Sequence, residues 1–452
     1  TAQQGQHAAA VGLRCSGSAR AALSRCLAEG GAGSNTMKIT VHKMRQVLRS
    51  PKVAAVAFEA PPPQYASGPA LAGALDGPPA FGPEAATTGT GVVRLQWAPL
   101  AAGLPAAVFI KWSTVEGIRR QYVAHHDAAA SEKKIAARVA AHASETVVYG
   151  TVAPTLRARG VRLPRAHAVE CVPGDHFALF LELKPGYSVR PALDPAAFTS
   201  AVRALAAFHG ACFGDAELMA HFEQQGCFWT AEKQDEPGPT QLGDAWIAFA
   251  ARFAAVGGGV GGRVATTAPS LDRVHRAVSA HFGEGRLARQ TLCHGDFKSA
   301  NLLWPTASAD SVEGDDRVGV PADGEPVLID FEWAGPGAAA QDLAYLLLSS
   351  CPVRVNWAEM VAAYHTQLPA GVREHYAAAE LQSDVELATL EVFRWLLCGR
   401  WKAITPAEME ADFASYGRVL PNRSIPHAVA LCRRVVDILE TNAFVQQVLA
   451  SP

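Results

Sequence analysis

Two short segments in the C-terminal half place carboxylate and amide side chains where short strands begin or end, and they constrain the fold most. The first, CHGDFKSANLLW, holds Asp296 and Asn301 five positions apart on a loop that enters an apolar strand. The second, VLIDFEWAGPGAAAQDLAYLL, places Asp330 at the end of an apolar strand and Asp342 at the start of a helix, after a Gly/Pro turn. The pattern predicts that oxygen atoms of Asp296, Asn301 and Asp330 gather at one site.

These residue types suit the handling of a nucleoside triphosphate. Phosphoryl transfer needs the triphosphate held, Mg²⁺ placed across its oxygens and the attacking hydroxyl aligned. Asn301 and Asp330 offer the oxygen ligands that Mg²⁺ prefers. Asp296 can accept or orient a hydroxyl proton, and its separation from Asn301 equals that of the D-x-x-x-x-N pattern of kinase catalytic loops. Asp and Asn are also ordinary turn formers, so it is the order of all three residues that favours a site.

Taken together, HGDFKSAN, LIDFEW and QDLAYLL resemble the aminoglycoside phosphotransferase and choline kinase superfamily. The closest resemblance is to its ecdysteroid-kinase-like (CHK kinase-like) branch. SETVVYGTVAP resembles a helix of that branch, with Glu145 and Tyr149 in the matching places, and FLEL resembles the segment that joins the two lobes. The resemblance covers roughly residues 92–350.

The resemblance implies an ATP- and Mg-dependent phosphotransferase that moves the γ-phosphate to a hydroxyl of a small-molecule acceptor. It implies that Asp296 is the catalytic base, on a loop shared with His294 and Gly295. It also implies that Asn301 and Asp330 bind Mg²⁺.

Five further residues take nucleotide-related or bracing roles by the same resemblance. Lys111, in VFIKW, corresponds to the strand lysine that contacts the ATP phosphates, and Glu145 to its ion-pair partner. Backbone groups around Glu182 and Leu183 correspond to the segment that binds adenine. Asp342 corresponds to a structural residue that braces the catalytic loop.

The order of predicted elements indicates an α+β, two-lobed protein-kinase-like fold, with an N-terminal antiparallel sheet lobe and a helical C-terminal lobe. VVRLQW and AVFIKW read as an antiparallel strand pair, followed by an Ala-rich helical stretch over residues 128–156 and by the strands VRLPRAHAVE and HFALFLEL. Asp194 and Pro195 then suit the N-cap and first position of a helix. We expect an N-terminal extension (residues 1–50), a nucleotide-binding lobe (51–184) and a helical lobe with the catalytic and substrate sites (185–452).

The glycine-rich phosphate loop is the least defined part of this pattern. TTGTG (residues 87–91) is the best candidate, and VAAVAFE (53–59) is the candidate first strand. The stretch between the two metal-ligand segments, residues 305–326, reads as an insertion. GGGVGG (257–262) lacks a following GK[ST] and reads as a linker.

The net charge, the apolar runs and the cysteines narrow the classes of function and the compartments that remain. The net charge of −2 gives no electrostatic reason for nucleic-acid binding, and no apolar run is long enough to predict a membrane span. Nine dispersed cysteines favour reduced thiols. Residues 1–37 are rich in Ala, Ser and Gly with three arginines and resemble a transit peptide, although a disordered tail is the simpler interpretation. We expect a cytoplasmic protein, or a chloroplast or mitochondrial one if that segment is a transit peptide; the oligomeric state stays open.

Plainer interpretations remain open for several residues. Lys111, Glu145 and Glu332 can be solvated side chains, and His209 fits a packed core position better than a catalytic one. Trp395 and Trp401 can form a cage for a cationic acceptor, but their helical spacing favours the core.

Two other functions also remain open. The first alternative is a catalytically inactive, kinase-like nucleotide-binding scaffold. The second, a protein kinase, is disfavoured because the loop reads HGD and no APE-type segment follows. The sequence does not identify the acceptor.

Overall fold

The computed structural model describes most of the chain from Ala107 onward and two strands before it. The described residues are 53–59, 88–97, 107–123, 128–172, 174–190, 192–231, 242–253, 263–283, 289–306, 324–352, 354–399, 401–415 and 424–451. They form two compact units. One contains the described residues up to Val139 together with Ala168–Phe180, and the other contains Ala140–His167 and the described residues from Leu181 onward.

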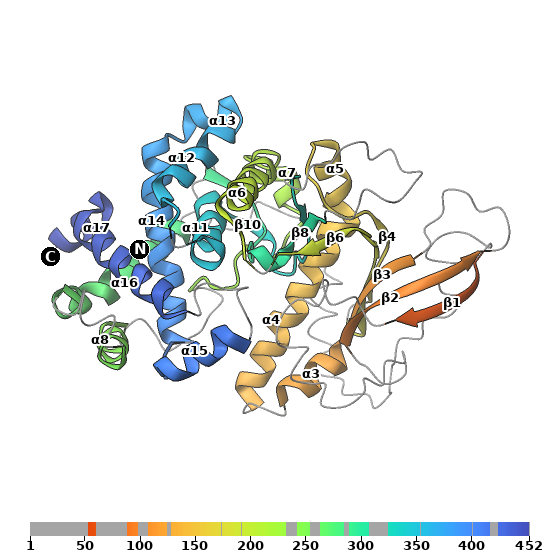
Figure 1. Cartoon of the computed structure of the whole chain (residues 1–452), viewed down its shortest axis with the longest axis horizontal. Coiled ribbons are helices and arrows are strands. Elements are labelled where there is room, and N and C mark those ends of the chain that lie inside the picture. Colours follow the sequence, from red (N-terminus) through yellow and green to blue (C-terminus); the bar gives the residue numbers. More distant parts are fainter. Residues whose placement is uncertain are drawn as a thin grey trace, which may run out of the picture. The chain divides into compact units, whose positions relative to one another are not determined.

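The first compact unit is built on a five-stranded sheet in the order β1-β2-β3-β5-β4. Figure 1 shows β1, β2 and β3 of this sheet side by side. The strands are β1 (Val53–Glu59), β2 (Thr88–Trp97), β3 (Ala107–Thr114), β4 (Ala166–Val172) and β5 (His176–Glu182). The predicted antiparallel pairing is confirmed, with β2 between β1 and β3 and Thr90 opposite Lys111. On β3, Val108, Ile110 and Trp112 alternate into the core, which is the period-two pattern of a half-buried strand.

Two local predictions for this region need correction. Thr88–Gly91, part of the candidate phosphate loop, lies inside β2 and pairs with β3, so these residues form a strand. Thr87 and the residues between β1 and β2 lie outside the described part. The predicted strand at Val161 begins only at Ala166. Pro164 explains the delay, because proline has no N–H for a strand ladder.

The predicted helical stretch after residue 128 is confirmed as three consecutive pieces. They are α4 (Ala128–Val147), the π-helical turn η2 (Val148–Val152) and α5 (Ala153–Ala158). A short helix, α3 (Val115–Val123), precedes them. π-Helical turns inside α-helices often occur at functional sites, and this one buries Tyr149.

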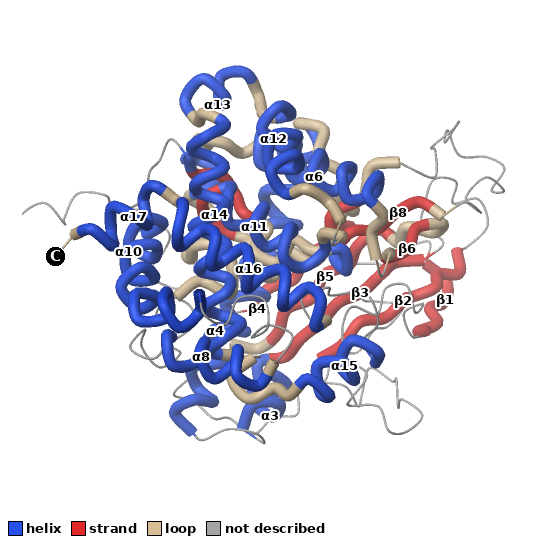
Figure 2. The backbone as a smooth tube through the Cα atoms, turned by 60° about the vertical axis from the view of Figure 1, so that its left-hand side comes forward, coloured by secondary structure: helices blue, strands red, loops and turns tan. Residues whose placement is uncertain are grey.

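The second compact unit is mainly helical, as predicted for the C-terminal region (Figure 2). Its helices of eight residues or more are α6 (Pro195–Gly210), α8 (Leu242–Arg252), α10 (Leu271–Gly283), α11 (Ala339–Ser350), α12 (Trp357–Gln367), α14 (Ala378–Cys398), α15 (Pro406–Ser415), α16 (Ile425–Thr441) and α17 (Ala443–Ala450). The short helices α7 (Ala216–Met219) and α13 (Ala370–His375) join them. Every residue of α11 is buried, as expected for a central helix.

Two small sheets of the second unit position the polar segments found in the sequence. β7 (Gln290–Cys293) pairs with β10 (Gly335–Ala338), and β8 (Leu302–Pro305) lies between β6 (Tyr187–Val189) and β9 (Val327–Leu328). The HGDFKSAN loop therefore runs from one sheet to the other. It ends in the 3₁₀ turn η6 (Ser299–Asn301).

The large aromatic side chains of the second unit mostly fill its core. Trp401 is fully buried and stacks on Phe249 with ring centroids 4.7 Å apart. This confirms the core interpretation for Trp401 over a role in a substrate cage. Within the described residues, no helix is long and apolar enough to cross a membrane.

The cap of α6 gives a stability prediction. Asp194 accepts a hydrogen bond from the Ala197 N–H at 2.8 Å, and Pro195 occupies the first turn, both as predicted. Asp194→Ala should lower the free energy of unfolding by about 1 kcal/mol, because one N–H at the helix start loses its partner. Asp194→Asn is the matched control and should be near neutral, since Asn caps equally well. Chemical denaturation of the three proteins checks this; equal losses in both variants would contradict it.

Candidate functional site

Asp342, in the first turn of α11, holds the start of the HGDFKSAN loop. Its carboxylate accepts the backbone N–H of His294 at 2.5 Å and that of Gly295 at 2.9 Å. The side chain is completely buried. Because two consecutive N–H groups point at one carboxylate, the loop backbone has a fixed direction as it leaves β7.

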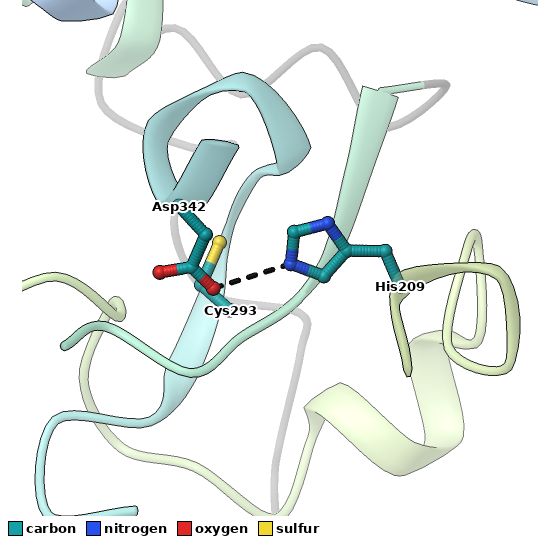
Figure 3. A group of neighbouring side chains, drawn as sticks. All are labelled: His209, Cys293 and Asp342. Atoms are coloured by element: carbon teal, nitrogen blue, oxygen red, sulfur yellow. Dashed lines mark hydrogen bonds and ion pairs between the residues drawn. The ribbon is translucent and has the colours of Figure 1, made fainter. Parts of the chain in front are cut away.

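A buried relay supports this carboxylate from behind. His209, at the end of α6, lies 3.2 Å from Asp342 through Nε2 (Figure 3). Its Nδ1 is 2.6 Å from the Tyr364 hydroxyl. In this geometry Nε2–H of His209 can donate to the Asp342 carboxylate, while Nδ1 accepts from the Tyr364 hydroxyl. His209 is therefore a packed core histidine, the interpretation favoured from the sequence.

The ionisation of Asp342 follows from these contacts. Burial alone would raise its pKa, but the hydrogen bonds from the His209 side chain and the His294 backbone N–H hold the pKa below its ordinary value. Cys293 also lies near His209 and Asp342, and the three could in principle surround a metal ion. The Asp342 oxygens already accept hydrogen bonds, so we interpret this cluster as a brace for the loop.

Gly295 is required by the backbone path. It has φ +81°, and a Cβ built on it would lie 1.9 Å from the Trp333 carbonyl oxygen. Only glycine tolerates both the left-handed conformation and this close approach. The catalytic-type loop and the IDFEW segment thus touch backbone to backbone.

His294 joins the same two segments through its side chain. Its Nε2 donates to the Ile329 carbonyl at 2.9 Å. Burial lowers the pKa of His294, although the Asp342 and Asp296 carboxylates oppose this. The ring therefore acts as a neutral hydrogen-bond donor.

Asp296 and Asn301 lie together at the end of this loop. The Asn301 amide donates to the Asp296 carbonyl at 2.8 Å and to Asp296 Oδ2 at 3.2 Å. Lys298 Nζ lies 2.6 Å from the same Oδ2. Asp296 Oδ1 and Asn301 Oδ1 are both buried and have no hydrogen-bond partner among the described residues.

The segment that carries Asp330 follows β9 and adjoins this loop. The preceding residue, Ile329, donates its N–H to the Asn301 carbonyl at 3.1 Å. Asp330 itself is half-buried and has φ +69°. Non-glycine residues with positive φ are uncommon, Asp and Asn tolerate them best, and they gather at functional sites. The structure thus brings the Asp296–Asn301 loop and the Asp330 segment side by side in one compact unit.

Phe331 anchors the Asp330 segment in the core. Its fully buried ring packs against His294 at 4.5 Å, Tyr149 at 5.8 Å and Phe208 at 5.8 Å between centroids. Tyr149 comes from the π-helical turn, so η2 contributes directly to the packing behind the site. No pattern in the sequence predicted this π-helical turn.

Glu145 is buried in a polar cluster. Glu145, His142 and Glu332 offer ligand atoms that all lie within 4.8 Å of one another, and His142 Nδ1 is 3.7 Å from Glu332 Oε1. All three are at most 6% exposed, so the interpretation of Glu145 and Glu332 as solvated side chains is wrong. His142 was missed from the sequence. Its separation of three residues from Glu145 on one helix was the available signal.

Lys111, Glu182 and Leu183 are the remaining residues predicted from the sequence. Lys111 is half-buried on β3 in the first unit, and its pairing with Glu145 stays a prediction. Glu182 ends β5; its N–H donates to the Arg165 carbonyl at 2.7 Å, and its carboxylate accepts from Lys184 at 2.7 Å. Burial opposes ionisation of Glu182, but the Lys184 hydrogen bond lowers its pKa overall. Leu183, the next residue, is half-buried.

A family model decides the broad identity of this arrangement. The model of the phosphotransferase enzyme family matches residues 118–375, more than half of the chain, and this range contains every candidate site residue named in this subsection except Lys111. The chain belongs to this phosphotransferase enzyme family. The ecdysteroid-kinase-like branch is not distinguished by the match and stays a prediction.

Solved structures similar to this phosphotransferase include several small-molecule kinases. An aminoglycoside phosphotransferase from Alicyclobacillus acidocaldarius is 17% identical, with 80% of this chain and 91% of that chain covered and a TM-score of 0.41. An ethanolamine kinase from Plasmodium vivax is 12% identical, with coverages of 93% and 96% and a TM-score of 0.38. A spectinomycin phosphotransferase in complex with ADP and spectinomycin is 10% identical, with coverages of 90% and 97% and a TM-score of 0.36. No curated protein matches the chain.

The α+β, two-lobed kinase-like fold predicted from the sequence agrees with this family membership and with the antiparallel sheet and helical unit of the phosphotransferase. Like His142, Lys298 lies near the site and was not predicted from the sequence. Its position two residues after Asp296, within the same motif, could have identified it.

The Asp342 brace gives a prediction with a defined pH dependence. Asp342→Asn should lower the free energy of unfolding at pH 7 by about 3–5 kcal/mol, because buried donors lose a charged acceptor. The folded-state pKa is lowered, so this stabilisation is fully present above the unfolded value of about 3.9 and is lost as the pH falls from there through the folded-state pKa. Denaturant titrations from pH 7 to pH 3 should show the difference between wild type and variant shrinking only below about pH 4. A difference that stays constant over this range would contradict it.

Proposed function

We propose that this phosphotransferase is an ATP- and Mg²⁺-dependent kinase that moves the γ-phosphate to a hydroxyl of a small-molecule acceptor. The observation that carries the proposal is the pair of buried, unpartnered oxygens, Asp296 Oδ1 and Asn301 Oδ1, on one rigid loop. A buried acceptor without a partner costs about 1–3 kcal/mol, so such atoms mark a place where a ligand or ion completes the structure.

The residues present fit a magnesium ion. Asn301 offers an amide oxygen with no donor on it, and Asp330 offers a carboxylate from the adjoining segment. Hard cations take oxygen ligands of these kinds together with phosphate oxygens. When bound, Mg²⁺ would neutralise charge on the phosphate oxygens. In the proposal, Asn301 is oriented for this role because its amide nitrogen already donates hydrogen bonds to Asp296.

Asp296 is the proposed base because its two oxygens differ. Oδ2 is occupied by Lys298 and the Asn301 amide, which fix the rotation of the carboxylate. Oδ1 has no partner among the described residues and can accept the proton of an acceptor hydroxyl. The carboxylate therefore presents one oxygen in a defined direction, which is what alignment of the attacking hydroxyl requires.

The proposed nucleotide contacts come from Lys111, Glu145 and Leu183. Lys111 is proposed to contact the ATP phosphates and Glu145 to pair with it. A lysine on a strand with buried neighbours and a glutamate kept out of solvent support these roles. Because the Glu182 N–H is committed to Arg165, we assign adenine binding to the backbone of Leu183 rather than to that N–H.

The rival function, an inactive nucleotide-binding scaffold, makes a different prediction. A scaffold needs the residues that bind the nucleotide, but it does not need a carboxylate base kept in a fixed orientation. The 2.6 Å contact of Lys298 with Asp296 Oδ2 and the hydrogen bond from the Asn301 amide to the same oxygen fix the rotation of the proposed base, and they favour the kinase.

Substitution of the base tests the transfer step. Asp296→Asn should keep nucleotide binding and lose transfer by about 10²–10⁴-fold, because proton acceptance is removed while the loop geometry is kept. Turnover of ATP over a panel of hydroxyl compounds, together with ADP binding, measures both properties. Asp437→Asn, an exposed aspartate on α16, is the matched control and should behave as wild type. Near-normal transfer in Asp296→Asn would remove Asp296 from the mechanism.

Substitution of the proposed metal ligands tests the cation site separately. Asn301→Ala and Asp330→Asn should each raise the Mg²⁺ concentration needed for ADP to stabilise the protein thermally, by about tenfold or more. The readout is the ADP-dependent rise in melting temperature as Mg²⁺ is titrated, which requires no turnover. An unchanged Mg²⁺ titration in both variants would exclude these residues as ligands.

A further inference from the structure

A cavity of about 270 Å³ lies in the helical unit, between the end of α11, the start of α12 and one face of α16. Its walls include Leu347, Leu348, Trp357, His427, Leu431 and Arg434. On α16, His427, Leu431 and Arg434 are four and three residues apart and share one face of the helix. The cavity therefore has an apolar floor and two nitrogen-bearing side chains along one wall.

The cavity lies behind α11 as seen from the proposed active site. Asp342 holds His294 and Gly295, and the Ser350 hydroxyl accepts the N–H of Ser299, so one face of α11 supports the catalytic loop. With 3.6 residues per turn, Leu348 lies on roughly the opposite face of this helix. The cavity is thus separate from the site assigned to the nucleotide and acceptor.

Arg434 gives the cavity its chemical character. Its guanidinium lies over the Trp357 ring, 5.3 Å from the ring centroid. Its Nη2 is 3.9 Å from Glu386 Oε1, which is too long for a hydrogen bond. That carboxylate already accepts hydrogen bonds from Gln382 and Asn442. Arg434 Nε is buried and has no hydrogen-bond partner among the described residues. A guanidinium held against a ring, with a buried N–H left over, suits a carboxylate ligand.

The surroundings of Arg434 favour a negative ligand further. The N-termini of α12 and α16 both border the cavity, and helix N-termini carry partial positive charge. Burial lowers the pKa of His427, although the Cys351 carbonyl opposes this, so its ring is neutral. Burial raises the pKa of the Cys351 thiol to about 12, so it adds no negative charge.

We propose that this cavity is a ligand site for a small organic carboxylate with an apolar body. The carboxylate would bind Arg434, and the body would lie on Leu347, Leu348 and Leu431. The volume is slightly below the roughly 300–1,000 Å³ of drug-sized pockets, which limits the ligand to a short aliphatic or single-ring acid.

The test uses octanoate and 3-phenylpropionate as probes, each with its uncharged amide, on the full-length protein. Binding is measured by calorimetry and by ligand-detected NMR. At least one acid should bind, and its amide should bind at least tenfold more weakly. Failure of both acids to bind, or equal binding of acid and amide, would overturn the proposal.

Variants locate the bound acid. Arg434→Gln should weaken acid binding at least tenfold, whereas Arg433→Gln, the neighbouring exposed arginine on the same helix, should not change it. Ala430→Phe places a ring at the exposed wall of the cavity and should block both acids while leaving Arg434 in place. Circular dichroism confirms that the variants fold. Equal acid affinity in Arg434→Gln and Arg433→Gln, or undiminished binding in Ala430→Phe, would place the acid elsewhere and refute the site.

Discussion

The carboxylate of Asp342 is the interaction on which the site depends. It accepts two consecutive backbone N–H groups of the HGD segment and is itself fixed by His209, which Tyr364 holds in turn. A buried charge is unfavourable unless it is fully hydrogen-bonded, and here the hydrogen bonds come from the loop that must be positioned. The requirement to satisfy one buried carboxylate and the requirement to fix the direction of the loop are therefore met by the same contacts.

The helix α11 extends this constraint along the loop. Asp342 at its start holds the residues before Asp296, and Ser350 at its end accepts the N–H of Ser299, just beyond Lys298. Asp296 thus lies on a segment attached to one rigid, fully buried helix on both sides. Phe331 and the Ile329 backbone then attach the Asp330 segment to the same loop. Three polar residues from two segments become a single constellation because few degrees of freedom remain between them.

Much of this arrangement was predictable because its signals are local. The spacing of Asp296 and Asn301, the strand before Asp330 and the Asp194 cap each lie within a few residues. The burial of Glu145 and Glu332 was not predictable in this way, since residues nearly two hundred positions apart shield one another and His142. The prediction of a phosphate loop at TTGTG was wrong for a related reason. Glycines suggest a loop, but pairing with β3 overrides that local preference. The left-handed conformation of Asp330 likewise follows from contacts of its neighbours that no local pattern records.

The unpartnered oxygens of Asp296 and Asn301 gain their meaning from how completely their surroundings are satisfied. The Asp296 Oδ2, the Asn301 amide nitrogen and the backbone of both His294 and Gly295 have partners, so the loop cannot relax to satisfy the two remaining oxygens without breaking bonds that hold it. Such preorganisation places the cost of orienting polar groups in folding rather than in the reaction. The hydrogen bonds of Asp342 stabilise the loop. This stability allows Asp296 and Asn301 each to keep an acceptor oxygen without a hydrogen-bond partner among the described residues.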